Sequence, residues 1–111
     1  MGDARLKTGL WASAALRLGT LADKPGILVR KGDTDAGGVV VKLYGRQGCV
    51  VLSQFRDVEG TLAWMRATGQ QPVTEEVAET YISKQIKMDP DIWVLEFEAA
   101  DYIPPFEAKV I

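Results

Sequence analysis

The stretch VVVKLYGRQGCVVL, residues 39–52, decides the fold of this chain. β-Branched residues fill both of its apolar runs, and such side chains favour strands and disfavour helices. The four residues between the runs, 45–48, include two glycines. A connection of this length and composition is typical of a β-hairpin. The sequence therefore predicts antiparallel strands over residues 39–44 and 49–55.

Further short apolar runs flank this hairpin on both sides. We expect strands over residues 27–31 and 92–98, because both runs follow a proline-containing break and are rich in residues that favour strands. In the second of them, Trp93, Leu95 and Phe97 alternate with more polar positions, so one face is expected to be buried. Residues 61–67 suit a fourth strand of the series or a single helical turn equally well.

Two segments show helical periodicity. From Thr8 to about Ala22, apolar residues recur every three to four positions, and Thr8 is placed to cap the first turn. The expected buried stripe of this helix is Trp11, Ala14, Ala15, Leu18 and Ala22. The second helix begins at Thr74, a good N-cap, has acidic residues in its first turn and ends at Asp89.

The resulting order is α-β-β-β-(β)-α-β, with short connections that favour antiparallel neighbours. We therefore expect an α+β fold, a two-layer sandwich in which an antiparallel sheet of four to five strands carries two helices on one face. The whole chain, residues 1–111, is expected to be one domain with a short flexible N-terminus (1–4) and an extended C-terminal tail (about 100–111).

Composition excludes most ordinary catalytic and metal centres. The chain has no histidine and one cysteine, Cys49, inside an apolar run. Histidine is the side chain that titrates near neutral pH and the commonest metal ligand. One cysteine cannot form an internal disulfide, and no apolar run approaches the roughly 20 residues that span a bilayer. We expect a soluble cytoplasmic protein with no membrane partner.

Each remaining polar motif has a simpler structural interpretation. The loop 33–38 fails the calcium-loop pattern and suits a turn with an Asp cap. Cys49 is expected to be a small buried hydrophobe rather than a nucleophile. Asp89 and Asp91 flank a proline at a helix end, where solvated acids are common. The sequence therefore predicts no catalytic residue, no metal site and no cofactor.

What remains is a contact surface. Residues 1–66 carry ten basic against six acidic side chains, whereas residues 67–111 carry three against nine. Basic residues lie on or beside the expected strands, and one tryptophan with its neighbour has no obvious place in the core. The candidate contact residues are Trp64, Met65, Arg30, Lys42, Arg46 and Arg56.

Several short motifs in a fixed order resemble a known family. They are Arg5-Leu6-Lys7 with Leu10-Trp11-Ala12, then Arg30 to Asp33 with Ala36-Gly37, and finally the segment from Asp89 to Glu96. Together they resemble a family of small bacterial proteins, domain-of-unknown-function family 1491, over nearly the whole chain. The resemblance implies a single small domain in a bacterial cytoplasm. The family has no assigned activity, so the resemblance implies no functional residue.

Three functional hypotheses follow. The favoured one is a non-enzymatic binding or assembly module that acts through protein contacts, including contacts with a second copy of itself at an open sheet edge. The second is a weak nucleic-acid-binding domain that uses the basic residues of the N-terminal two thirds. The third is a small-ligand protein or an enzyme that relies on carboxylates.

Overall fold

A computed structural model describes residues 7–111, and it contains a five-stranded sheet with two helices. The expected flexible segment 1–4 lies outside the described residues. The elements in chain order are α1 (Thr8–Leu21), β1 (Gly26–Arg30), β2 (Val39–Gly45), β3 (Gly48–Arg56), β4 (Leu62–Arg66), α2 (Glu75–Met88) and β5 (Trp93–Glu98). The expected α+β class is confirmed, and the ambiguous segment 61–67 forms a strand.

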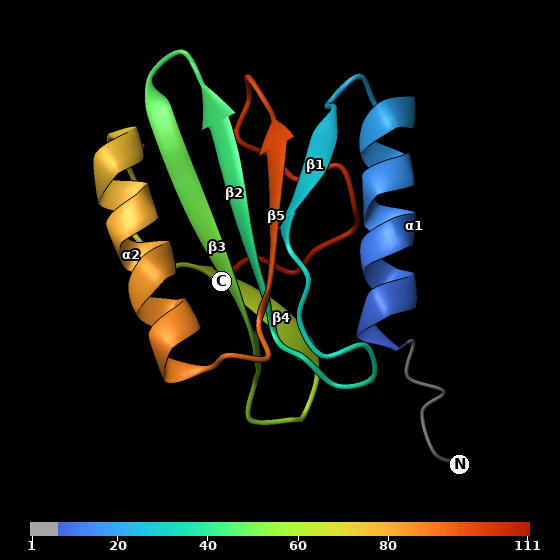
Figure 1. Cartoon of the computed structure of the whole chain (residues 1–111). Coiled ribbons are helices and arrows are strands. Elements are labelled where there is room, and N and C mark those ends of the chain that lie inside the picture. The colour runs from blue at the N-terminus through green and yellow to red at the C-terminus, as the bar shows by residue number, and fades with distance from the viewer. Residues whose placement is uncertain (1–6) are drawn as a thin grey trace.

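The strands lie in the order β1-β5-β2-β3-β4 (Figure 1). The predicted hairpin is present, with Val40 opposite Ser53 and Gly45 opposite Gly48. The sheet departs from the expected antiparallel arrangement in one pair, because β5 runs parallel to β2. After β4 the chain crosses through α2 and inserts β5 between β1 and β2, and parallel neighbours require such a crossover.

The two helices cover opposite faces of the sheet, whereas the sequence suggested one face. Ala12 and Ala15 of α1 belong to a core cluster with Val41 of β2. Ala78 of α2 belongs to a second cluster with Val40. Successive side chains of a strand point to opposite faces, so β2 is buried on both sides. Its continuous apolar run is the sequence signature of that double burial.

Helix α1 packs on the sheet through its small residues. Ala12, Ala15 and Gly19 are its buried positions. A Cβ atom at Gly19 would lie 2.8 Å from the Phe97 ring, so only glycine permits this approach. Of the stripe that periodicity predicted, Ala15 is buried and Trp11 is half-buried. Ala14, Leu18 and Ala22 are exposed, so most of that prediction is wrong.

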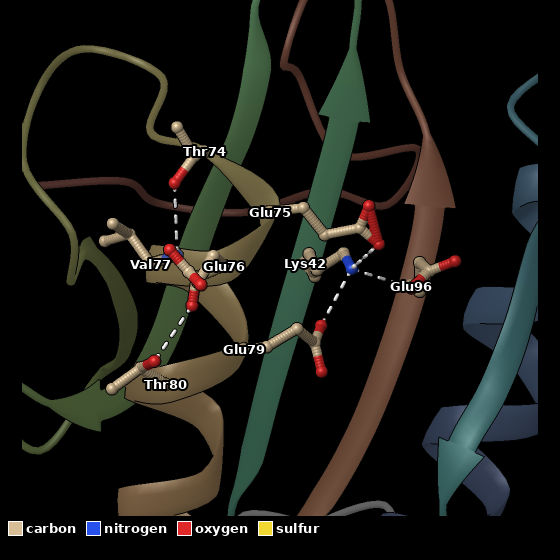
Figure 2. Close-up of polar contacts among 8 residues, drawn as sticks. All are labelled: Lys42, Thr74, Glu75, Glu76, Val77, Glu79, Thr80 and Glu96. Carbon is tan, nitrogen blue, oxygen red and sulfur yellow. Dashed lines mark hydrogen bonds and ion pairs between the residues drawn. The ribbon is translucent and has the colours of Figure 1, made fainter.

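The starts of the two helices differ. Thr74 caps α2 as predicted, because its hydroxyl accepts a hydrogen bond of 3.2 Å from the Val77 N–H (Figure 2). The N-cap of α1 is instead Lys7, without a side-chain cap. The Thr8 hydroxyl donates a hydrogen bond of 2.9 Å to the Gly37 carbonyl oxygen, and this bond connects the helix to the loop before β2.

The C-terminal residues return across the face that carries α1. Phe106 is buried, and its ring centroid lies 5.1 Å from that of Trp11 and 5.2 Å from that of Trp64. The last residues run beside β4. There the backbone N–H of Trp64 donates to the Lys109 carbonyl, and the backbone N–H of Ile111 donates to the Trp64 carbonyl. Part of the β4 edge is therefore paired within the chain.

Candidate functional site

The predicted contact residues do not share one surface. Arg30 lies on β1 and Met65 on β4, the two opposite edges of the sheet. Arg46 precedes β3 and Arg56 ends it, so these two cations lie near opposite ends of the same strand. The structure therefore does not bring the basic residues together as a binding face.

Trp64 is a core residue, and this corrects its assignment to a contact surface. Its side chain is 2% exposed and its ring centroid lies 5.7 Å from that of Trp11. Its neighbour Met65 is 44% exposed. The alternation of side chains along β4 separates the two, so the tryptophan faces the core while the methionine faces solvent.

Lys42 forms the most distinctive polar cluster of the described residues (Figure 2). Its side chain is 5% exposed, although it is a lysine in the middle of a strand. The ammonium group lies 2.8 Å from Glu79 Oε2, 3.2 Å from Glu96 Oε1 and 3.6 Å from Glu75 Oε1. The parallel register places Lys42 beside Glu96, while α2 supplies the other two carboxylates.

This cluster stabilises a charge rather than activating a nucleophile. Burial alone would lower the pKa of Lys42, but hydrogen bonds to Glu79 and Glu96 outweigh it and raise the pKa above its ordinary value. A lysine that acts as a nucleophile needs the opposite shift, toward neutrality. The cluster therefore holds α2 to the centre of the sheet and leaves no free amine for chemistry.

Two hollows of ligand size open on the surface. One of about 360 Å³ lies beside the Lys42 cluster and reaches Tyr44 and Cys49. The other, of about 510 Å³, lies between the start of α1 and the β3–β4 end of the sheet, where Trp11 and Arg56 contribute to its wall. Small-molecule sites commonly have such volumes, so these hollows are where a ligand would bind under the small-ligand hypothesis. No cluster of acidic and cysteine side chains within residues 7–111 is suited to hold a metal ion.

Cys49 is buried beside the first hollow. Burial raises the pKa of its thiol, since the low-polarity surroundings disfavour the thiolate. The thiolate is the reactive form of cysteine. Cys49 therefore behaves as the small core residue that the sequence predicted.

The raised pKa of Cys49 gives a prediction about alkaline stability. Above the ordinary thiol pKa of about 8.5 the unfolded chain releases this proton while the folded chain retains it, so the free energy of unfolding falls as the pH rises. In Cys49→Ala this contribution is absent, and we expect a shallower decline. Urea unfolding at several pH values between about 7.5 and 9.5 measures how the free energy of unfolding of each protein depends on pH. This range lies below the pH at which lysine and tyrosine titrate. Parallel pH profiles for the two proteins would contradict the expectation.

Two of the segments that carry the family resemblance, residues 30–37 and residues 89–96, meet at one end of the sheet. The Asp33 N–H donates to the Asp91 carbonyl, and the Trp93 indole N–H donates 2.7 Å to the Asp33 carbonyl. Arg30 Nη1 reaches the carbonyl oxygens of Pro90 and Ile92 at 2.8 and 2.9 Å. These contacts lock the loop before β2 onto the residues that lead into β5.

Within this junction the acidic side chains cap backbone groups. Asp33 Oδ2 accepts from the Ala36 N–H at 3.1 Å, and Asp89 Oδ1 accepts from the Asp91 N–H at 3.1 Å. Gly32 and Gly37 approach the Asp91 carbonyl so closely that a Cβ atom at either would collide with it. The Asp cap expected for the turn at residues 33–38 is therefore confirmed. Gly37 and Gly38 do not have positive φ, and glycine is needed at position 37 for the close approach instead.

The outer edge of β1 is the strongest candidate for a contact site. Within residues 7–111, β1 has a neighbour on one side only, namely β5. The Glu98 N–H donates to the Pro25 carbonyl, and the register continues with Gly26 opposite Phe97 and Ile27 opposite Glu96. Hydrogen-bonded and non-bonded pairs alternate along antiparallel strands. The N–H and C=O groups of Gly26 and Leu28 therefore point away from the sheet.

Apolar side chains accompany these outward backbone groups. Ile27, Leu28 and Val29 are 59%, 42% and 51% exposed, and they follow one another in the chain. The residues before and after them are held to the body of the protein. Lys24 Nζ lies 3.1 Å from Asp101 Oδ2, and Arg30 is bound as described above. We call residues 26–29 with their outward backbone groups the β1 edge.

Sequence reasoning missed this site, although a signal was present. Pro25 and the cations Lys24, Arg30 and Lys31 flank the run 27–29. Prolines and basic residues next to a short apolar strand are typical of a sheet edge. The sequence predicted an extended tail from about residue 100, and the last residues of that tail pair with β4.

Fold and surface together define a small α+β domain whose distinctive features are a buried ionic cluster and an open strand edge. The chain belongs to the family described as "Protein of unknown function (DUF1491)", which matches residues 6–107. A crystal structure of a DUF1491 family protein from Caulobacter crescentus CB15 is similar, with 29% identity, 96% of this chain and 100% of that chain covered, and a TM-score of 0.86.

Two solution structures agree in fold. The NMR structure of a DUF1491 family protein from Caulobacter crescentus CB15 has 29% identity, covers 98% of this chain and 99% of that chain, and gives a TM-score of 0.85. The protein Atu0922 from A. tumefaciens has 18% identity, covers 94% of each chain and gives a TM-score of 0.80. No curated protein matches the chain.

Proposed function

We propose that this protein is a non-catalytic binding module that joins a protein partner by strand addition at the β1 edge. The observation that carries the proposal is the coincidence of outward backbone groups at Gly26 and Leu28 with three consecutive exposed apolar side chains. An edge strand offers unpaired N–H and C=O groups to another chain. In strand addition, those groups supply affinity and the alternate side chains supply specificity.

Local features limit the edge to a short, defined contact. Pro25 lacks an N–H, and the register with β5 shifts between Leu28 and Arg30. A proline and a bulge both interrupt extended pairing, which is how natural sheets avoid indefinite aggregation. The segment left for pairing is Gly26–Leu28, long enough for one specific strand.

We place this module in the cytoplasm. The support is the single buried thiol of Cys49 and the absence of any cysteine with which it could pair in the chain. Disulfides are frequent in small exported domains and rare in the cytoplasm. No helix within residues 7–111 is long and apolar enough to cross a membrane.

Site-specific photo-cross-linking tests the proposal. A photo-reactive amino acid at position 27, in the full chain expressed in its native cell, is expected to give a discrete protein adduct. The same residue at position 58 is the matched control, because Val58 is 104% exposed in a turn far from β1 in the sheet order. A second change, Leu28→Lys, should remove the adduct at position 27. An absence of adducts at position 27, or equal labelling at both positions, would overturn the proposal.

A further inference from the structure

We infer that the strand added at the β1 edge belongs to a second copy of this chain, paired antiparallel about a two-fold axis through Ile27. The inference rests on the proposed function and names its partner.

The outward backbone groups fix the register. Gly26 and Leu28 are the residues whose N–H and C=O groups point away from β5. A two-fold axis through Ile27 sets Gly26 opposite Leu28 of the partner subunit, and Leu28 opposite Gly26 of the partner subunit. Each such pair exchanges two hydrogen bonds, so the contact gains four without any backbone change. The two sheets then form one continuous sheet.

Side chains in this register complement one another. Ile27 faces its own symmetry mate in a non-hydrogen-bonded pair, where side chains lie closest. Leu28 lies across from a glycine, which leaves room for the larger side chain. Ile27 and Leu28 are 59% and 42% exposed in one chain, and the contact covers both copies of each. Burial of exposed apolar surface favours association.

The charges beside the edge do not oppose this pairing. Lys24 would face Arg30 of the partner subunit in the same register, and like charges directly opposite are destabilising. Both cations are turned into their own chain, however. Lys24 Nζ contacts Asp101 Oδ2 and the Ile103 carbonyl at 3.1 and 2.9 Å, and Arg30 Nη1 contacts the Pro90 and Ile92 carbonyls at 2.8 and 2.9 Å.

The contact is small, so association should depend on concentration. Four backbone hydrogen bonds and a few apolar side chains form less than the roughly 800 Å² per partner of a standard stable interface. Light scattering during size-exclusion chromatography of the full chain should show a mass that rises from monomer toward dimer with loading. A strict monomer over the whole range would count against the inference.

Disulfide trapping tests the register directly. In Ile27→Cys the two introduced cysteines face each other with Cα atoms about 4.5 Å apart, within the range that a disulfide needs. Under mild oxidation we expect a disulfide-linked dimer that forms at least about tenfold faster than in Val58→Cys, since the pairing holds the two thiols together. Cys49 is buried and gives no background.

A third variant separates the possible failures. Ile27→Cys with Leu28→Lys should lose the rapid cross-link, while its melting temperature shows whether it remains folded. Equal rates in Ile27→Cys and Val58→Cys would overturn the two-fold pairing. If a different protein is then captured at position 27 in cells, the binding function stands with another partner. If position 27 captures nothing, both the pairing and the function fail.

Discussion

Replacing Phe97 with alanine is expected to lower the free energy of unfolding by about 4 kcal/mol. Phe97 is fully buried on β5, and its ring centroid lies 6.1 Å from that of Phe106. Gly19 and Gly26 approach the ring from α1 and β1 so closely that neither position has room for a Cβ atom. The neighbouring backbone cannot move in to fill the space, and cavities that cannot collapse give the largest losses.

Urea unfolding followed by tryptophan fluorescence measures this loss. Phe55→Ala is the matched control, because this substitution removes the same number of atoms from a side chain that is only half-buried on β3. A small domain has a stability of about 5–15 kcal/mol, so the Phe97 variant should be close to unfolding while the control remains well folded. Equal losses in the two variants would contradict the packing described for β5.

Replacing Lys42 with methionine is expected to cost about 3 kcal/mol. Methionine keeps most of the buried volume but removes the charge that Glu79 and Glu96 contact at 2.8 and 3.2 Å. Removing one partner of a buried ion pair typically costs about 3–5 kcal/mol, because the other charge stays unpaired. The lower end applies here, since the Glu79 side chain is 53% exposed and water can reach it.

The control for Lys42→Met is Lys7→Met. Lys7 pairs with Asp35 at 3.7 Å, and their side chains are 65% and 71% exposed. Exposed pairs contribute about 0–1 kcal/mol, so this variant should change the midpoint of urea unfolding little. Similar losses in both variants would show that the Lys42 cluster does not hold α2 to the sheet.

The stabilising effect of Lys42 also has a pH signature. Its pKa is raised in the folded protein, so its contribution is fully present below the ordinary lysine value of about 10.4 and is lost as the pH rises through the raised value. As the pH rises above about 10.4, the free energy of unfolding should therefore fall less steeply for Lys42→Met than for the natural protein. The comparison uses the same unfolding measurement at high pH.

Local signals predicted the elements of this fold. The run at residues 39–52 formed its hairpin, and Thr74 capped its helix. Both depend on residues that are close in sequence. The arrangement of the layers depends on distant ones: α1 approaches the sheet through Gly19 because Phe97 lies beneath it, and periodicity alone favoured the larger Leu18.

The candidate site was harder to predict for the same reason. A lone lysine within residues 39–44 gave no sign of its partners, because Glu96 and Glu79 reach it from a parallel strand and a helix far along the chain. Which strand lies at an open edge depends on the insertion of β5 beside β1. Strand order comes from such non-local pairing, so Pro25 and the flanking cations did not by themselves identify the strand at Ile27 as the open edge.

Amide hydrogen exchange at two adjacent residues tests the central claim most directly. The Ile27 N–H points toward β5 and should exchange slowly, while the Leu28 N–H points outward and should exchange rapidly in dilute protein. Raising the protein concentration, or adding whichever partner is captured at position 27, should slow exchange at Leu28 and leave Ile27 unchanged. A Leu28 amide that exchanges at the same rapid rate under all of these conditions would contradict contact through β1.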